Sequence, residues 1–177
     1  LPPHRSQSLK VPIIQIIQFS NQVQPGNRLT LNPNIMQNHE FEIVATYTTA
    51  EAVEDGTLIL VDDNIRNEAG IRYPVYLTQA VYEKYVKVPK GMEGIQDETG
   101  RLWDVLLMFA IKAKMTKAAV LFFHLICRLP DNGDWESNEK RPLKDDTIRE
   151  VHLKAICTGR DFDDPSPAIF IMKPSED

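Results

Sequence analysis

The chain has 177 residues, of which 42% are hydrophobic and 25% charged, and its formal net charge is −5. This length suits one domain with an arm or insertion, and such a domain buries enough surface to fold without a metal or disulfide. The acidic balance excludes a generally phosphate-binding surface and is too mild for a mimic of DNA. A local basic patch stays open because net charge averages over all faces.

The apolar runs are far shorter than the ~20 residues that a membrane-spanning helix needs, so we expect a cytoplasmic protein without a membrane segment. The chain begins at Leu1 rather than Met, so we expect an N-terminal portion to be absent from it. Cys127 and Cys157 lie in strand-like apolar runs. We interpret them as reduced, buried thiols, with a disulfide between neighbouring strands and a catalytic thiol as the alternatives.

Residues 1–40 differ in composition from the rest of the chain, because they are rich in glutamine and proline and contain one acidic residue, Glu40. We interpret them as an N-terminal arm laid across the body or a poorly ordered leader. Residues 11–19 suit a strand better than a helix because of their β-branched content. Residues 41–177 are predicted to form a single α+β domain that starts with a short strand at 41–47.

Three short helices are predicted, each from a capping residue and a stop signal. In the first, Thr48 and Glu51 match the capping box, in which each side chain binds the backbone N–H of the other residue. Gly56 then suits the left-handed stop of that helix. The second helix should start at Asp62 or Asp63 and stop at Gly70. The third should start at Thr78 and stop before Pro89.

Short strands are predicted at residues 57–61, which should be buried, and at 166–173. Residues 71–78 form another extended segment, and Pro74 within it predicts an edge strand because proline cannot donate to the ladder. Residues 148–157 alternate between apolar and polar side chains, which predicts a half-exposed strand. Its buried face carries Arg149, Val151, Leu153, Ala155 and Cys157, and its other face carries Glu150, His152 and Lys154.

Residues 100–129 are the most hydrophobic part of the chain. Two apolar runs flank a basic tip at 112–117, which predicts a β-hairpin buried on both faces at the centre of the sheet, with a turn at 98–100. We therefore predict an α+β fold with a mainly antiparallel sheet of about five to seven strands. Two or three short helices should pack on one side of this sheet.

The polar connection at residues 130–147 exceeds the ~12–15 residues beyond which loops in compact domains are usually functional or disordered. Trp135 is its only large apolar side chain. It either pins the loop to the body or is presented to a partner. His124 and Asp104, two polar side chains that interrupt the apolar runs, also have two interpretations each.

The sequence contains no nucleotide-binding, hydrolase or zincin motif. The catalytic candidates are therefore weak, namely Glu98, Asp104 and His124. His124 suits a hydrogen-bonded core histidine or a general base facing a pocket. Asp104 suits a hydrogen-bonded buried carboxylate or a perturbed acid at the mouth of a site. We predict no cofactor and no metal site, because even a pairing of His124 with His152 would supply only two ligands.

Binding candidates are residues that could contact a partner from the surface or the hairpin. The lysines of the basic tip could touch phosphate, although hairpin tips are commonly rich in lysine because they are solvated. His124 and Cys127 differ by an odd number, so we expect them on opposite faces of one strand. The full set of binding candidates is Arg101, Trp103, Lys112, Lys114, Lys117 and Trp135.

Residues 47–62 read YTTAEAVEDGTLILVD, and residues 96–106 contain the pattern Q-x-E-x-G-R-x-W-D-V-L. With Ala69-Gly70, Pro74 and Thr78, these segments resemble a family of uncharacterised bacterial domains found in plasmid, phage and other mobile-element settings. The resemblance covers about residues 47–173 and omits the N-terminal arm and the 130–147 loop. The family has no assigned activity, so the resemblance implies a setting and no catalytic residue.

We expect a non-enzymatic binding or regulatory accessory protein of a prokaryotic mobile element, which works through a protein partner or self-association. Such a protein should present an exposed patch or a dimer face. The alternative is a small hydrolase or transferase, which requires Glu98, Asp104 and His124 to meet in one cleft. The second alternative is a nucleic-acid-binding protein that uses the basic tip.

Overall fold

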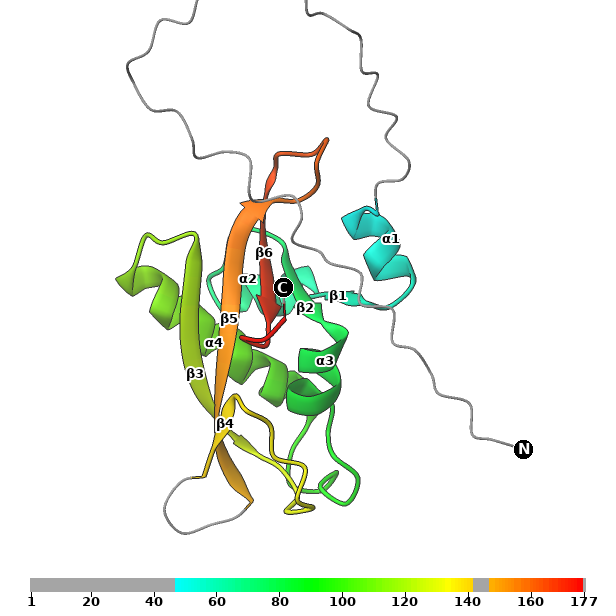
Figure 1. Ribbon diagram of the computed structural model, residues 1–177, viewed down its shortest axis with the longest axis vertical. Helices are drawn as coiled ribbons and strands as arrows, with labels where there is room; N and C mark the ends of the chain where they lie inside the picture. The colour runs from blue at the N-terminus through cyan, green and yellow to red at the C-terminus, as the bar shows by residue number, and fades with distance from the viewer. Residues whose placement is uncertain (1–46, 142–146, 177) are drawn as a thin grey trace, which may run out of the picture. The chain divides into compact units, whose positions relative to one another are not determined.

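The computed structural model describes residues 47–141 and 147–176, and Tyr47–Glu176 form one compact unit. The expected N-terminal arm and the strand predicted at 41–47, apart from Tyr47 itself, lie outside the described residues. Within them, a mixed sheet is flanked by helices (Figure 1). The strands are β1 (Leu58–Leu60), β2 (Val75–Thr78), β3 (Val120–Arg128), β4 (Glu139–Lys140), β5 (Ile148–Gly159) and β6 (Pro167–Met172).

The strand order across the sheet is β1-β2-β6-β5-β3, and β4 pairs with β5 away from this path. Only the β2–β6 pairing is parallel among the described strands, and the others are antiparallel. The predicted α+β class with a mainly antiparallel sheet is therefore confirmed. The helices are α1 (Thr49–Glu54), α2 (Asp63–Glu68), α3 (Gln79–Val81), which continues as the π-helical turn η2 (Tyr82–Val86), and α4 (Glu98–Met115).

The capping residues place the short helices as the sequence predicts. Thr48 donates its backbone N–H to Glu51 Oε2 at 2.8 Å, and the Glu51 N–H donates to Thr48 Oγ1 at 3.2 Å. Gly56 follows α1 with φ 81°, a left-handed conformation that glycine adopts without a Cβ clash. Asp62 caps α2, and Thr78 caps α3.

The predicted hairpin over residues 100–129 is wrong in its first half, because Glu98–Met115 is the long helix α4. Asp97 begins this helix, and its Oδ1 accepts a hydrogen bond from the Gly100 N–H at 2.8 Å. A run that is apolar at nearly every position has no clear period, so a helix and a buried strand look alike in the sequence. The buried side chains of α4 do follow helical spacing: Arg101, Val105, Leu106, Phe109 and Ala110.

The second half of that hairpin is a strand, β3, but it lies at the edge of the sheet rather than at its centre. Burial alternates along β3, with the odd-numbered residues from 121 to 127 buried and the even-numbered residues exposed. The predicted burial on both faces is therefore wrong. An edge strand whose inner face packs on α4 leaves its other face to solvent.

Pro74 does not mark an edge strand, because β2 lies between β1 and β6. Proline is tolerated here because it precedes the first ladder residue, and its carbonyl accepts a hydrogen bond from the Ile169 N–H at 2.9 Å. The other end of the sheet is the short strand β1, where Leu60 is exposed rather than buried as expected.

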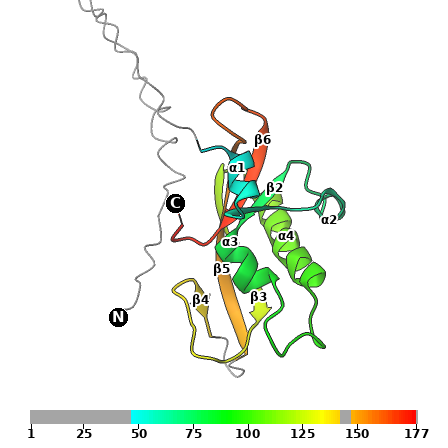
Figure 2. The same ribbon diagram turned by 90° about the vertical axis from the view of Figure 1, so that its right-hand side faces the viewer.

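Two hydrophobic clusters hold the sheet between its helices. The larger one lies between one sheet face and the helices α2, η2 and α4. Figure 2 shows α2 and α4 on the same side of the sheet. The smaller one joins α1 to the opposite face through Ala52, Tyr76 and Phe170. Because α1 covers this second face only near β2 and β6, the part formed by β3 and β5 has no helix over it among the described residues.

Candidate functional site

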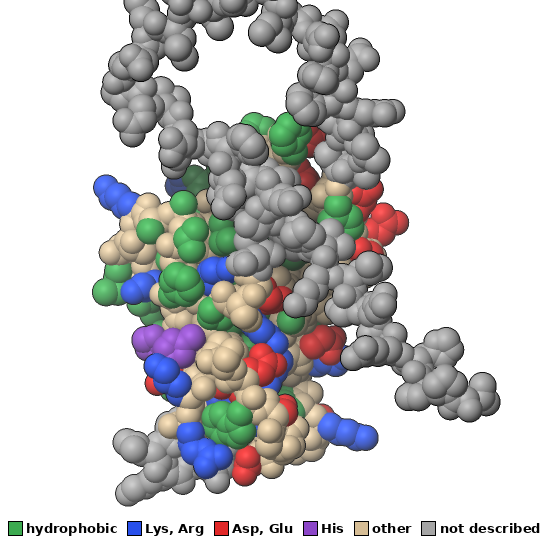
Figure 3. All heavy atoms as spheres, in the orientation of Figure 1, with side chains coloured by type: hydrophobic (Ala, Val, Ile, Leu, Met, Phe, Trp, Pro, Cys, Tyr) green, Lys and Arg blue, Asp and Glu red, His purple; other side chains and the backbone are tan. Residues whose placement is uncertain are grey.

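The outward face of β3 carries large hydrophobic side chains exposed to solvent. Val120, Phe122 and Ile126 have exposed fractions of 44%, 56% and 58%. His124 lies on the same face, as the alternation of a strand requires. Figure 3 views this side of the molecule and shows hydrophobic side chains near the histidines. We call these four residues the β3 face, and contiguous exposed apolar residues of this kind mark interaction sites.

The backbone edge of β3 also lies open as far as Arg128, whose carbonyl accepts hydrogen bonds from Arg101 and Gln96. On its paired side, the Cys157 N–H donates to the Ala119 carbonyl at 2.7 Å, and the Leu129 N–H donates to the Thr147 carbonyl at 2.8 Å. Hydrogen-bonded positions alternate along an antiparallel ladder, so the backbone groups of the even-numbered residues between them point away from β5. No second strand pairs with β3 within the described residues. A row of outward N–H and C=O groups is a template for another strand.

A groove of about 390 Å³ runs along this edge between β3 and α4. It brings together two of the three catalytic candidates, Asp104 from α4 and His124 from β3. Their neighbours in the groove are mainly apolar side chains. The remaining lining residues are Leu107, Met108, Leu125, Ile126 and Glu150.

Glu98 is not part of this groove. It lies in the first turn of α4, where the Tyr82 hydroxyl donates to its Oε2 at 3.3 Å. Asp104 lies in the middle of the same helix rather than near a strand start. Its side chain is exposed, so the interpretation of Asp104 as a hydrogen-bonded buried carboxylate is wrong. Its partial burial in the groove still raises its pKa, and the smaller opposing effect is the charge of Arg101. The groove therefore holds one perturbed carboxyl group and one imidazole, without the third member of the expected set.

The two histidines of the described chain pair across the sheet. His124 lies opposite His152 in the β3–β5 register, and their ring centroids are 5.8 Å apart. His152 Nε2 is 3.0 Å from Glu150 Oε1. His124 is exposed, so the interpretation of a hydrogen-bonded core histidine is wrong. Cys127 points to the opposite, buried face, as the odd spacing predicts.

Neither cysteine has the environment of a nucleophile. Both are free thiols, and burial raises the pKa of each. Cys127 pairs with Arg149 and Cys157 with Ile169. Because Arg149 and Cys157 stand eight residues apart on β5, the two thiols are separated by ~26 Å along the strand direction. This separation rules out the alternative of a disulfide between them.

Arg101 and Trp103, two binding candidates, serve the packing of α4. The Arg101 guanidinium is buried and donates to the carbonyls of Val86 at 3.0 Å and Arg128 at 2.9 Å, as well as to the side chain of Gln96. These bonds tie the start of α4 to η2 and to the end of β3. Trp103 is partly buried and packs against the larger core cluster.

The predicted basic tip does not exist as a hairpin tip. Lys112 and Lys114 lie in the last turn of α4, and Lys117 follows the helix. Cations at a helix C-terminus interact favourably with the helix dipole. Residues two apart on a helix point in different directions, so Lys112 and Lys114 do not lie side by side as a hairpin tip would place them.

Trp135 pins residues 130–141, the first described part of the 130–147 loop, to the sheet, which was one of its two predicted roles. The guanidinium of Arg149 lies 4.2 Å from the centroid of its indole ring, and that of Arg141 lies 5.0 Å from it. The ring is half-buried rather than presented to solvent. Stacking of this kind is a cation–π interaction.

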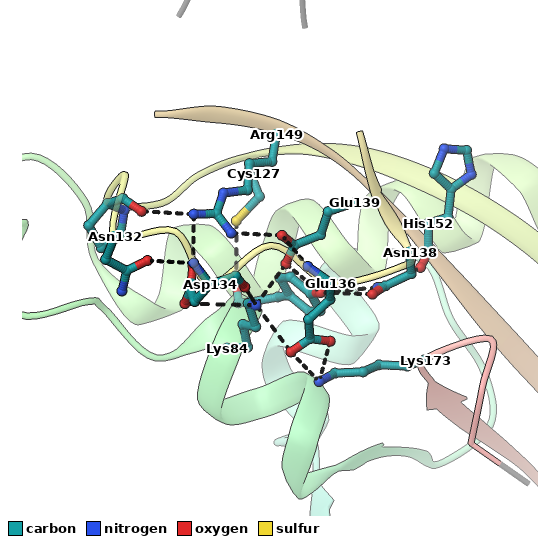
Figure 4. Close-up of polar contacts among 12 residues, drawn as sticks. Lys84, Cys127, Asn132, Asp134, Glu136, Asn138, Glu139, Arg149, His152 and Lys173 are labelled. Atoms are coloured by element: carbon teal, nitrogen blue, oxygen red, sulfur yellow. Dashed lines mark hydrogen bonds and ion pairs between the residues drawn. The ribbon is translucent and has the colours of Figure 1, made fainter. Parts of the chain in front are cut away.

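Next to Trp135, charged side chains from the loop, η2, β5 and the residue that follows β6 form the partly buried network shown in Figure 4. Arg149 donates to Glu139 at 2.7 Å and to the Pro130 carbonyl at 2.8 Å. Lys84 lies 3.1 Å from both Glu136 and Glu139. Further members of the network are Tyr85, Asp134, Asn138 and Lys173.

The electrostatics of this network favour its charged state. Burial acts to raise the pKa of Glu139, but hydrogen bonds from Arg149, Lys84 and Tyr85 outweigh it and hold that pKa below its ordinary value. The pKa of Asp134 is lowered in the same way by Arg149 and Lys84 against burial. Burial is also the main cause that raises the pKa of Tyr85. The carboxylates and cations of the network pair with one another, apart from Arg149 Nε, which is buried without a hydrogen-bond partner among the described residues. The network therefore holds the loop to the sheet.

Sequence reasoning missed the two features that dominate the site. The exposed residues of β3 were hidden because their run looks buried on both faces. One sequence signal indicated the network, namely the charge of Arg149 at the start of an apolar strand face. Burial alternates as expected from Ile148 to Leu153, and Arg149 is fully buried. The predicted half-exposed strand is wrong beyond that point, because Lys154 and Ile156 of the other face are also buried.

Comparison with known proteins found no matching family model, no curated protein with significant similarity and no similar solved structure. Among the described residues, no group of three or more His, Cys, Asp and Glu side chains could hold a metal ion. In the same part of the chain, no helix is both long enough and apolar enough to cross a membrane.

Proposed function

We propose that this protein is a non-enzymatic binding protein that takes up an extended segment of a protein partner along the edge and face of β3. One observation carries the proposal: a nine-residue edge strand with large apolar side chains exposed on its outward face. Strand addition at such an edge draws affinity from backbone hydrogen bonds and specificity from alternate side chains.

The contrast between the two edges of the sheet supports this proposal. β1 forms the opposite edge and has only three residues, which leaves little backbone to pair. β3 is three times as long and contains no proline, glycine or lysine. Proteins commonly protect an edge strand by shortness, proline or inward lysine. The unprotected edge of β3 is therefore suited to a partner strand.

A selection from a displayed library of random linear peptides tests the proposal. Peptides that bind the full chain should lose at least about tenfold in affinity for Phe122→Thr, which corresponds to ~1.4 kcal/mol. Threonine keeps a high strand propensity, so the ladder should persist. Phe162→Thr is the matched control, because Phe162 is also an exposed phenylalanine but lies in the loop before β6. Selected peptides that bind both variants as well as the unmodified chain would contradict the proposal.

A small hydrolase or transferase is the second candidate function, because Asp104 and His124 line one groove. It would use Asp104 as the acid and His124 as the base, without Glu98. Hydrolysis of p-nitrophenyl esters and phosphates that disappears in both Asp104→Asn and His124→Gln would favour this candidate. Equal rates in the two variants and the unmodified chain would exclude it for these substrates.

The setting is also a proposal. The resemblance of about residues 47–173 to uncharacterised bacterial domains supports an accessory role in a prokaryotic mobile element, in the cytoplasm. A nucleic-acid-binding role finds less support, because the expected basic hairpin tip is replaced by the end of α4, where Lys112 and Lys114 point in different directions. Absence of salt-sensitive retention on immobilised DNA and RNA would exclude that role.

A further inference from the structure

We infer that the strand taken up by β3 is β3 of a second copy, so that the two sheets join across a twofold axis centred on His124. This inference rests on the proposed binding function and names its partner. Its basis is the self-complementarity of the strand, the groove beside it and the charges at its ends. A twofold interface requires one surface patch to match itself.

The sequence of β3 matches itself when it runs antiparallel about His124. Phe122 of one copy then lies opposite Ile126 of the second, and His124 lies opposite its own counterpart. On the inner face, Phe123 meets Leu125 and Leu121 meets Cys127. Each of these cross-strand pairs joins apolar or uncharged side chains, and such pairs stabilise a sheet. Arg128 faces Val120 of the second copy, so no like charges are placed opposite each other.

The backbone pattern allows the same register. The even-numbered residues of β3 direct their N–H and C=O groups away from β5, as the ladder hydrogen bonds at Ala119 and Leu129 require. In a pairing centred on His124, even-numbered residues face even-numbered residues. Between Phe122 and Ile126, every outward donor of one strand therefore meets an outward acceptor of the other, whereas the Arg128 carbonyl opposite Val120 already accepts a hydrogen bond from Arg101 at 2.9 Å.

The groove beside β3 supplies a second contact layer. A twofold axis perpendicular to the sheet puts α4 of both copies on the same side, where they face each other across the axis. The side chains of α4 that would meet are apolar and partly or largely exposed: Leu107, Met108, Ile111 and Met115. Figure 1 shows α4 beside β3 at this end of the sheet.

The charges at the ends of the strand also fit the twofold arrangement. Nine strand residues span ~30 Å. At the ends, the register brings the exposed Lys117 towards the exposed Asp131 of the second copy. This pairing of opposite charges favours the antiparallel orientation.

Register-specific crosslinking of the full chain tests the inference. In a Cys127→Ala, Cys157→Ser background, oxidation should crosslink His124→Cys to itself, because the two residues would face each other across the axis. Phe122→Cys should not crosslink to itself, since its counterpart would be ~13 Å away along the strand. A mixture of Phe122→Cys and Ile126→Cys should crosslink. Equal crosslinking of all three samples would overturn the inference.

Sedimentation of the chain with its native cysteines provides a measurement that does not depend on the cysteine variants. The chain should be a dimer, and His124→Lys should raise the dimer dissociation constant at least about tenfold, because like charges directly opposite each other destabilise a ladder. His152→Lys is the control, since it places the same charge on the neighbouring strand β5, one strand further from the axis. A monomer, or equal effects of the two substitutions, would overturn the inference.

The outcomes separate this inference from the proposed function. A monomer that still binds selected peptides at β3 would overturn the dimer and leave the binding function in place. A monomer that binds none would contradict both. A monomer whose β3 amides resist hydrogen exchange would show that residues 1–46 of the same chain cover the edge, which also overturns the dimer.

Discussion

Arg149 donates a hydrogen bond to Glu139 across 2.7 Å, and neither side chain has any exposed surface. Glu139 belongs to the short strand β4 inside the long loop, whereas Arg149 belongs to β5 in the sheet. This one contact therefore joins the loop to the body. A buried ion pair adds little net stability, but removing one partner leaves an unpaired charge in the interior.

Replacement of Glu139 with glutamine should lower the free energy of unfolding by about 3–5 kcal/mol, because Arg149 would lose its buried counter-charge. Urea unfolding followed by circular dichroism measures this change. Glu83→Gln is the matched control, since Glu83 pairs with Lys87 at 2.8 Å on the surface, where both side chains are about half exposed. We expect less than ~1 kcal/mol for that exposed pair.

Replacing both partners should destabilise the protein by less than the sum of the two single replacements. In Glu139→Leu with Arg149→Met, the two groups of the closest buried ion pair are replaced together by apolar side chains. The sum of the two single destabilisations should therefore exceed that of the double variant by at least ~1 kcal/mol. Strictly additive free energies would show that Glu139 and Arg149 act independently, contrary to their geometry.

The same network should make the loop sensitive to acid. The folded pKa values of Glu139 and Asp134 lie below their ordinary values of 4.5 and 3.8. The folded carboxylates thus bind protons less tightly than the unfolded ones, and their contribution to stability is complete above these values. It is lost as the pH falls through the lowered pKa values. In a Trp103→Phe background, Trp135 fluorescence should change below about pH 4. An unchanged emission spectrum down to global unfolding would contradict this.

Asp104 should have the opposite pH dependence, because burial raises its pKa above the ordinary value of 3.8. Its folded form binds the proton more tightly than its unfolded form, so its contribution favours folding at low pH and is lost as the pH rises through the folded pKa. Asp104→Asn should therefore raise the urea midpoint at pH 7 and have a smaller effect at pH 4. Asp163→Asn, at an exposed loop position, should change neither midpoint. A lower midpoint of Asp104→Asn at pH 7 would contradict the raised pKa.

Local sequence signals predicted the three short helices and the buried face at the start of β5. The capping residues Thr48, Asp62 and Thr78 identified their helices because a cap is a local hydrogen-bonding pattern that needs no tertiary context. The strict alternation of β5 likewise marked its buried face. Both kinds of signal depend on residues close together in the sequence, so they survive without knowledge of the fold.

The failures lie where the sequence signal has no period. Residues 102–111 are apolar at nearly every position, and their assignment as a strand ignored Asp97, which caps α4 at Gly100. β3 was predicted at the centre because its outward residues are as hydrophobic as its inward ones. The hydrophobic outward residues of β3 are now the main indication of its function, because an edge strand needs apolar residues on only one face for folding. Tertiary context decides between these interpretations, and the sequence alone does not contain it.

Trp135 offers the last test of how the loop is held. Its ring lies under the guanidinium of Arg149 at 4.2 Å, so Trp135→Ala should release the loop while the sheet remains folded. Limited proteolysis should then cut within residues 130–141 several times faster, because cleavage follows local opening. Phe162→Ala is the matched control, since Phe162 is an aromatic residue of another loop and is 74% exposed. It should leave the cleavage rate unchanged. Equal rates for Trp135→Ala and the unmodified chain would mean that the ion pairs hold the loop without the indole ring.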